Sequence, residues 1–119
     1  MRCVIVDDNE SFLEAARAFL ERDGLAIAGV ASNSSEALRQ VEMLQPQVVL
    51  VDVSLGEENG LDLARRLLEG DLGCRAVVIL ISTRAEEDLV DLIAESPAAG
   101  FLQKEELSAS AIRRIVDGR

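Results

Sequence analysis

Short apolar runs and longer amphipathic segments alternate along the whole chain. The runs that we interpret as strands are residues 3–6, 25–31, 48–51, 76–81 and 100–102. Apolar residues recur at intervals of three and four, as in helices, in segments 9–24, 34–45, 59–70, 83–95 and 108–118. This alternation is typical of strand–helix–strand units, which build a parallel sheet. The sequence therefore predicts five strands and five helices.

Local signals mark where several of these helices begin and end. Asn9 can cap the first helix and Gly24 can end it, and Pro46 stops the second helix. Thr83 and Glu86 have the spacing of a capping box at the start of the fourth helix. The periodicity predicts that the helices bury these side chains: Phe12, Ala16, Phe19 and Leu20; Ala37, Leu38, Val41 and Leu44; Leu61, Ala64, Leu67 and Leu68; Ile112, Ile115 and Val116.

The last three predicted strands are nearly continuous aliphatic runs, without the alternation of a half-exposed strand. Such strands are covered by helices on both faces of a sheet. We therefore expect a doubly wound α/β fold, a three-layer α/β/α sandwich around one parallel sheet. The length of 119 residues, of which 49% are hydrophobic, suits a single domain over residues 1–119. Right-handed crossovers then bring the loops after the strands to one edge of the sheet, where such folds bind ligands.

Polar residues that could bind a ligand or take part in a reaction follow four of the five predicted strands. They are Asp7 and Asp8 after the first strand, Asp52 at the end of the third, Ser82 and Thr83 at the end of the fourth, and Lys104 after the fifth. Taken singly, each is more simply explained as a solvated turn, a helix cap or a surface lysine. Together they bring three carboxylates, a hydroxyl and the chain's only lysine to one edge. This combination predicts a functional site.

Composition restricts the chemistry of that site. The chain has no histidine, which excludes catalytic arrangements built on histidine. A formal net charge of -10 disfavours direct nucleic-acid binding. The aliphatic runs are too short to span a membrane, and we expect a cytoplasmic protein. Cys3 and Cys74 lack the spacing of metal ligands and are interpreted as free thiols.

Three clustered carboxylates repel one another. Unless a cation lies among them, at least one of Asp7, Asp8 and Asp52 should bind a proton more readily than a free aspartate does. Oxygen ligands favour Mg²⁺, or alternatively Mn²⁺, over softer metals. Mg²⁺ is commonly bound by one or two carboxylates together with a phosphate. The cluster therefore predicts a metal site that serves phosphoryl chemistry.

The segments "CVIVDDNE", "VVLVDVSLG", "ILIST" and "GFLQKEE", in this order and spacing, resemble the receiver domain of bacterial two-component response regulators. The resemblance covers the whole chain and implies a flavodoxin-like fold with strand order 2-1-3-4-5. It also implies a signalling switch, in which a sensor histidine kinase supplies a phosphoryl group to Asp52 in a Mg²⁺-dependent reaction. Such a domain catalyses only its own phosphorylation and dephosphorylation and is not otherwise an enzyme.

The same resemblance implies a role for each residue at the predicted edge. Asp52 is the implied phosphoacceptor. Asp8 and Asp52 would bind Mg²⁺ together with the backbone carbonyl of Ser54, and Asp7 would hold metal-bound water. Lys104 would contact the phosphoryl oxygens.

Further implied roles concern the switch and its lifetime. Ser82 would turn its hydroxyl toward the phosphoryl group, and the Phe101 ring would change rotamer with it. Ser54 and Arg84 would border the phosphoryl group and help to set how quickly water removes it. Glu105 stands where a proline often follows the lysine, so a cis peptide is not assumed there.

The resemblance also suggests partners for the domain. The ending "AIRRIVDGR" looks most like that of receivers that precede a helix-turn-helix output domain, which implies regulation of transcription. A homodimer could form through helix 83–95, strand 100–102 and helix 108–118, because family members commonly use that face.

Three other functions are compatible with parts of the pattern. A receiver-like docking module without phosphorylation is disfavoured by the intact Asp8, Asp52, Ser82 and Lys104. A phosphohydrolase of the haloacid dehalogenase class expects a second aspartate where Ser54 stands. A flavin carrier of the same topology is disfavoured because the chain has no Trp or Tyr to stack on the flavin ring.

Overall fold

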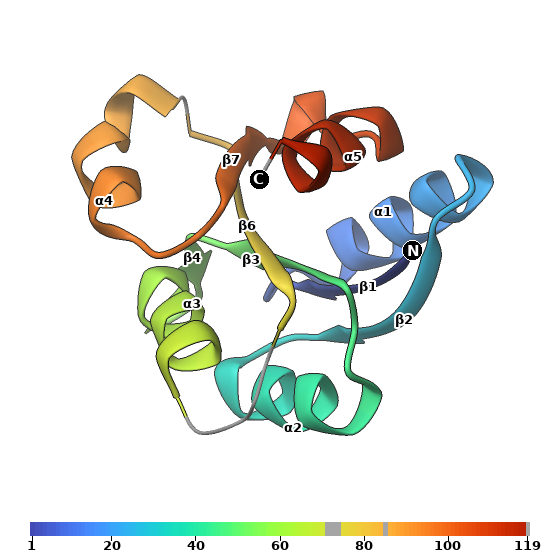
Figure 1. The fold of residues 1–119 in the computed structure, drawn as a ribbon, viewed down its shortest axis with the longest axis horizontal. Coiled ribbons are helices and arrows are strands. Elements are labelled where there is room, and N and C mark those ends of the chain that lie inside the picture. The colour runs from blue at the N-terminus through green and yellow to red at the C-terminus, as the bar shows by residue number, and fades with distance from the viewer. Residues whose placement is uncertain (71–74, 85, 119) are drawn as a thin grey trace.

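The computed structural model describes the chain except for residues 71–74, 85 and 119. A five-stranded parallel sheet lies between two layers of helices (Figure 1). Its strands are β1 (Arg2–Val6), β2 (Ala26–Ala31), β3 (Val48–Asp52), β6 (Val77–Ser82) and β7 (Gly100–Gln103). Their order in the sheet is β2-β1-β3-β6-β7. This arrangement confirms the predicted three-layer sandwich and its strand order.

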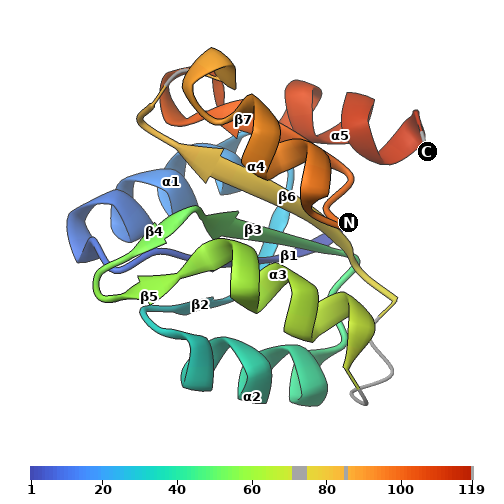
Figure 2. The same ribbon diagram turned by 90° about the vertical axis from the view of Figure 1, so that its left-hand side faces the viewer.

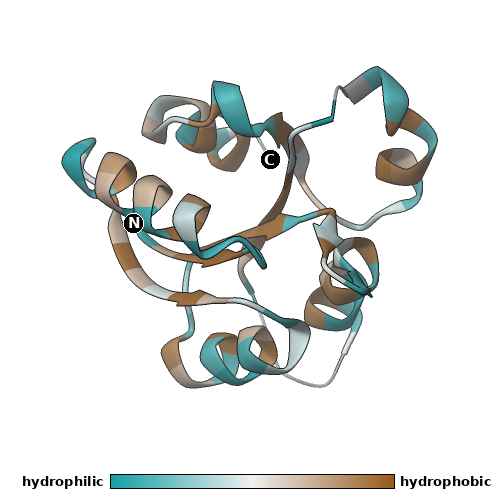
Figure 3. Cartoon of the chain, turned by 180° about the vertical axis from the view of Figure 1, so that it is seen from behind, coloured by the Kyte–Doolittle hydropathy of each residue, from teal (hydrophilic) through white to brown (hydrophobic). Residues whose placement is uncertain are grey.

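Helices cover both faces of the sheet (Figures 1 and 2). The helices α1 (Glu10–Arg22) and α5 (Ala109–Asp117) pack on one face. The opposite face is covered by α2 (Ser34–Leu44) and α3 (Gly60–Glu69), with α4 (Val90–Glu95) at its margin. Figure 3 shows the hydrophobic positions concentrated on the strands between these layers.

The inner strands are buried on both faces. Val4 and Val6 of β1 belong to the core under α2 and α3, whereas Cys3 and Ile5 belong to the core under α1 and α5. Because neither face of such a strand meets water, both sets of alternate positions are apolar. The same burial explains why β3 and β6 read as continuous aliphatic runs.

The buried face of α1 differs from the prediction. Ala16 and Leu20 are buried as expected, but the third buried residue is Leu13. Phe12 is only half-buried, and Phe19 is 43% exposed. A narrow stripe of Leu and Ala side chains lets the helix pack closely on the sheet, so the bulkier rings lie at its margins. The expectation that Phe19 faces the core is therefore wrong.

The other predicted helix faces are confirmed in outline. The residues expected to face inward are buried or partly buried, namely Ala37, Leu38, Val41, Leu44, Leu61, Ala64, Leu67, Leu68, Ile112, Ile115 and Val116. Leu63 of α3 is fully buried and was not predicted to be.

The start of the fourth helix is a second correction. The chain leaves β6 through a turn in which the Arg84 backbone N–H donates to Ser82 Oγ at 3.0 Å. Residues Glu86–Asp88 form a 3₁₀ turn, and α4 begins only at Val90, without a side-chain cap. The capping box expected at Thr83 does not start this helix. The reason is tertiary, because Leu89 is buried in the core and fixes where the helical segment begins.

The loop after β3 contains an element that the sequence pattern did not predict. Two short strands, β4 (Ser54–Leu55) and β5 (Glu58–Asn59), pair as an antiparallel hairpin. Leu55 anchors this hairpin in the core, and Gly56 occupies the left-handed region with φ of 63°. Figure 2 shows the hairpin at the carboxyl end of β3.

Several local predictions are confirmed. Asn9 caps α1 by accepting a hydrogen bond from the Phe12 backbone, and α2 ends at Leu44, two residues before Pro46. Cys3 is a buried free thiol, and its burial raises the pKa of that thiol to about 12. Cys74 lies outside the described residues. No helix in the described part of the chain is long and apolar enough to cross a membrane.

Candidate functional site

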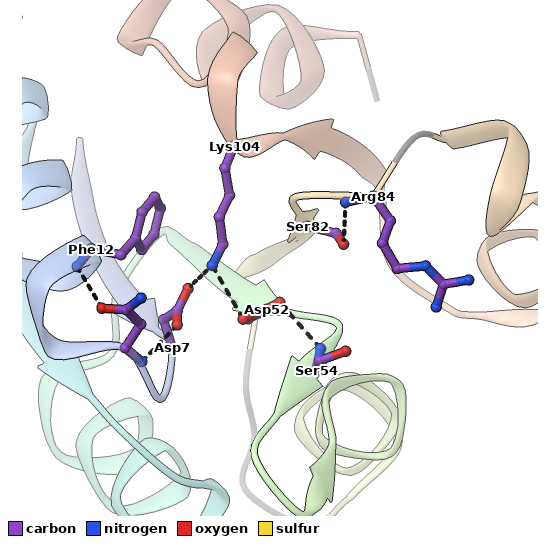
Figure 4. A network of polar contacts seen from close by, with 8 residues as sticks. Asp7, Phe12, Asp52, Ser54, Ser82, Arg84 and Lys104 are labelled. Atoms are coloured by element: carbon purple, nitrogen blue, oxygen red, sulfur yellow. Dashed lines mark hydrogen bonds and ion pairs between the residues drawn. The ribbon is translucent and has the colours of Figure 1, made fainter.

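The carboxyl ends of four neighbouring strands bring the candidate residues together. Asp7 follows β1, Asp52 ends β3, Ser82 ends β6, and Lys104 follows β7. Because these strands are parallel and adjacent, their ends share one edge of the sheet. Figure 4 shows Asp7, Asp52 and Lys104 pointing toward one another at this edge. The predicted edge constellation is therefore present.

Lys104 lies between two buried carboxylates. Its Nζ is 2.5 Å from Asp7 Oδ2 and donates a hydrogen bond of 3.3 Å to Asp52 Oδ2. The Asp7 side chain is fully buried, and that of Asp52 is 9% exposed. The contact to Asp7 Oδ2 is an ion pair without the alignment of a hydrogen bond, so this buried oxygen accepts no aligned bond within the described structure. The Lys104 ammonium is thus the partner of both carboxylates.

Asp52 is held in place by the loop that follows it and is difficult to ionise. The Ser54 backbone N–H donates to Asp52 Oδ1 at 3.1 Å. Burial raises the pKa of Asp52 to about 6; repulsion from Asp7 adds to this rise, and the bonds from Ser54 and Lys104 oppose it. One carboxyl of the cluster therefore binds a proton more readily than a free aspartate, as predicted, but burial is a larger cause than repulsion.

Lys104 remains a cation in this environment. Burial by itself lowers the pKa of Lys104, but the contacts with Asp7 and Asp52 raise it more, and the net shift is upward. The Phe12 ring lies beneath the ammonium, with its centroid 4.2 Å from Nζ, in the geometry of a cation–π contact. The sequence analysis missed this contact because it interpreted Phe12 as a core residue.

Three carboxylates form a pocket of oxygen ligands suited to a hard cation. One oxygen each from Asp7, Asp8 and Asp52 can be chosen so that all lie within 4.8 Å of one another. Asp8 is exposed, and its Oδ2 lies close to Gly56, where an added Cβ would be 3.4 Å away. The oxygen-only donors and the poorly satisfied Asp7 Oδ2 fit Mg²⁺ or Mn²⁺.

Gly60 helps to position Asp52, and the sequence analysis missed it. It is the first residue of α3, and its backbone N–H donates to Val53 O at 2.9 Å. A Cβ at this position would lie 1.8 Å from the backbone carbonyl oxygen of Asp52, which is impossible without displacement. The close approach of α3 to the end of β3 thus requires glycine. The only sequence signal was the "NG" pair before the helix.

Three of the predicted residues do not contact the carboxylates. Ser82 is buried, and its Oγ accepts the Arg84 backbone N–H rather than a bond from the site. In Figure 4 the Arg84 guanidinium points away from Asp52, and Arg84 makes no ion pair among the described residues. Phe101 is half-buried and packs against the core under α2 and α3.

The peptide after Lys104 is trans, since the described residues contain no cis peptide bond. Lys104–Glu106 instead form a 3₁₀ turn that leads into α5. Lys104 contacts Asp52 although no proline follows it.

Comparisons with known proteins agree with this geometry. The family model described as the response regulator receiver domain matches residues 3–117. The uncharacterized transcriptional regulatory protein YvfU of Bacillus subtilis is 30% identical over 123 residues, and the match covers 100% of this chain. The chain spans 60% of the length of that relative.

Solved structures with the same fold include response regulators. A two-component response regulator of the LuxR family from Aurantimonas sp. SI85-9A1 matches with a TM-score of 0.86 and 25% identity, over 99% of this chain and 86% of that chain. A response regulator from Burkholderia pseudomallei, solved with a phosphorylated aspartic acid, calcium ion and citrate, matches with a TM-score of 0.80 and 26% identity. That match covers 97% of this chain and 65% of that chain.

Proposed function

Because this chain belongs to the response regulator receiver domain family, whose members are signalling domains, we propose that it is a switch activated by phosphorylation of Asp52. The observation that carries the proposal is the buried pairing of Lys104 with both Asp7 and Asp52, next to a third carboxylate. The phosphorylated aspartate of the Burkholderia relative supports the same chemistry. The proposed donor is the phosphohistidine of a sensor kinase.

In the proposed reaction an Asp52 carboxylate oxygen attacks the phosphorus of the donor. The phosphorus–nitrogen bond breaks, its electron pair passes to the imidazole nitrogen, and that nitrogen takes up a proton from solvent. The Ser54 backbone N–H fixes the orientation of the attacking carboxylate through Oδ1. Lys104 provides a fixed positive charge for the phosphoryl oxygens, so charge compensation needs no histidine.

A divalent cation is part of this proposal. Asp8 and Asp52, with the backbone carbonyl of Ser54, are the proposed ligands for Mg²⁺ or Mn²⁺, and Asp7 would hold metal-bound water. Bound Mg²⁺ supplies charge neutralisation where the carboxylates and a phosphoryl group meet. The exposed position of Asp8 leaves the cation side of the cluster open to solvent and donor.

Labelling with a small phosphodonor tests the function. Incubation with acetyl phosphate and Mg²⁺ should add one phosphoryl group to the wild-type protein, as measured by intact-mass spectrometry, because the site supplies the chemistry without a kinase. EDTA should prevent the addition, and hydroxylamine should remove the group, as it does from an acyl phosphate. The proposal fails if the protein stays unlabelled under conditions that label another receiver domain.

We propose that Ser82 and Phe101 transmit the phosphorylated state. Ser82 Oγ lies at the end of the strand next to Asp52 and would exchange the Arg84 amide for a phosphoryl oxygen. Phe101 would then move into the vacated space, and Ser54 and Arg84 would influence the lifetime of the phosphoryl group. The proposed output surface is α4, β7 and α5, where Val90 and Leu92 are 56% and 47% exposed.

Nuclear magnetic resonance can test this relay with beryllofluoride as a mimic of the phosphoryl group. In the wild type we expect shifts of amide resonances on α4, β7 and α5 as well as around Asp52. Ser82→Ala should still bind the mimic but lose most of the distant shifts, whereas Ser82→Thr, which keeps a hydroxyl, should retain them. Distant shifts of unchanged size in Ser82→Ala would exclude Ser82 as the relay.

The proposal extends to the rest of the protein. Residues 1–119 are proposed to form a single receiver domain in the cytoplasm, followed by a DNA-binding output domain that regulates transcription. The name of YvfU, which is longer than this chain, supports that context. Dimerisation through the α4, β7 and α5 face would link phosphorylation to output. The intact carboxylates and Lys104 favour this function over a docking module without phosphorylation.

A further inference from the structure

The hairpin after the phosphoacceptor is part of the site. Its strands pair Ser54 with Asn59 and Leu55 with Glu58, and the Ser54 backbone N–H bonds Asp52 Oδ1. Any movement of the hairpin therefore moves a group that orients the Asp52 carboxylate. Leu55 anchors one side of the hairpin in the core, but Ser54 and Glu58 are exposed. The exposed side needs a second attachment if Ser54 is to stay in place.

Glu58 makes that attachment to a distant helix. Its Oε1 accepts a hydrogen bond of 2.9 Å from the backbone N–H of Ser34, which is the first residue of α2. An N–H in the first turn of a helix has no partner within the helix, and the helix dipole favours a carboxylate there. The neighbouring cap, Asn33, is already used, because its side chain accepts from the Glu36 backbone. Glu58 thus satisfies a separate donor of α2.

We propose that Glu58 is a positioning residue for phosphorylation: it links the β4–β5 hairpin to the start of α2 and thereby keeps the Ser54 backbone against Asp52. This inference rests on the proposed function of Asp52. The geometry gives the link two consequences. It restricts opening of the hairpin, and it connects the phosphorylation site mechanically to α2.

Glu58→Ala tests the link in two measurements. In metal-free protein, hydrogen exchange of the Ser34 and Ser54 amides should accelerate about two- to fivefold, the range expected for one charged acceptor at a partly exposed helix N-terminus. Mg²⁺ affinity, measured by calorimetry, should weaken by at most the same factor, because the proposed ligand at Ser54 is in place for a smaller fraction of the time.

Two matched variants separate positioning from charge. Glu57→Gln removes the same charge from the adjacent exposed position, which makes no hydrogen bond among the described residues. Glu57→Gln should keep the Mg²⁺ affinity and the Ser54 exchange rate of the wild type. Glu58→Gln retains an acceptor oxygen and should recover most of the loss.

The outcomes separate this inference from the proposed function. Faster Ser54 exchange and weaker Mg²⁺ binding in Glu58→Ala alone support the positioning role. Unchanged Ser54 exchange in Glu58→Ala, or an equal loss of affinity in Glu57→Gln, overturns it. A wild-type protein that neither binds Mg²⁺ nor accepts a phosphoryl group overturns the proposed function, whereas the exchange measurement still decides whether Glu58 holds the hairpin.

Discussion

Replacing Asp52 with asparagine is expected to abolish phosphorylation and, in the same protein, to stabilise the metal-free fold by about 2 kcal/mol at pH 7. The first effect follows from loss of the proposed nucleophile. The second follows from the raised pKa of Asp52, about 6, which is caused chiefly by burial. A shift of roughly two units corresponds to about 3 kcal/mol against the ionised form. Asparagine recovers only part of this energy because its amide nitrogen suits Lys104 less well.

The sign of the pH dependence gives the sharper test. Between about pH 4 and pH 6 the native state binds more protons at Asp52 than the unfolded state does. The free energy of unfolding of the wild type therefore falls as the pH rises through this window, and Asp52→Asn lacks that contribution. We expect the stability advantage of the variant to be largest at pH 7 and to shrink toward pH 4 in urea titrations with EDTA.

Glu57→Gln provides the control for this measurement, because it removes an exposed carboxylate from the same loop. It should show neither the advantage at pH 7 nor its decline toward pH 4. Mg²⁺ at ten times its dissociation constant should add about 1.4 kcal/mol to the wild type by mass action and much less to Asp52→Asn. An Asp52→Asn protein that is less stable than the wild type at pH 7 would contradict the assignment of a buried carboxylate with a raised pKa.

Sequence patterns predicted the sheet and the edge of the site well because those features depend on burial and chain order. β3 and β6 are covered on both faces. Burial then disfavours polar side chains along these strands, and their aliphatic runs are easy to recognise in the sequence. Once the strands are parallel and in the right order, Asp7, Asp52 and Lys104 must meet. No side-chain geometry is needed for that conclusion.

Other features depend on tertiary contacts that leave little trace in the sequence. The rotation of α1 decides whether Phe12 faces the core or Lys104, and the periodicity did not resolve that rotation. The strands β4 and β5 have two residues each, too few to show alternation. The bond between Glu58 and Ser34 joins residues 24 positions apart.

Helix boundaries show the same limit. Thr83 and Glu86 have the spacing of a capping box, yet α4 begins at Val90 because burial of Leu89 outweighs that local signal. At α1 and α2 the local signals and the packing agree, and there the predicted caps and stops hold. Local chemistry thus predicts a helix end only where the core does not impose another one.

Gly60 provides the clearest case in which local propensity and tertiary structure predict opposite results. As the first residue of α3, Gly60 should be replaceable by alanine with a gain of up to about 1 kcal/mol, judged from helix propensity alone. The structure predicts a loss instead, because the new Cβ would lie 1.8 Å from the Asp52 carbonyl oxygen. Relieving that overlap requires α3 and β3 to separate, and we expect Gly60→Ala to lose about 3 kcal/mol of unfolding free energy.

The separation of α3 from β3 in Gly60→Ala should also slow phosphorylation of Asp52. Asp52 would move with its own backbone, and a misplacement of about 1 Å can slow a positioned reaction by roughly 100-fold. We therefore expect the folded fraction of Gly60→Ala to be labelled by acetyl phosphate far more slowly than the wild type. Gly118→Ala at the end of α5, where the nearest atom to the added Cβ is 3.1 Å away, is the matched control and should change neither property appreciably. If Gly60→Ala melts at or above the wild-type temperature and is labelled at the wild-type rate, close packing of α3 against the Asp52 backbone does not position the proposed phosphoacceptor.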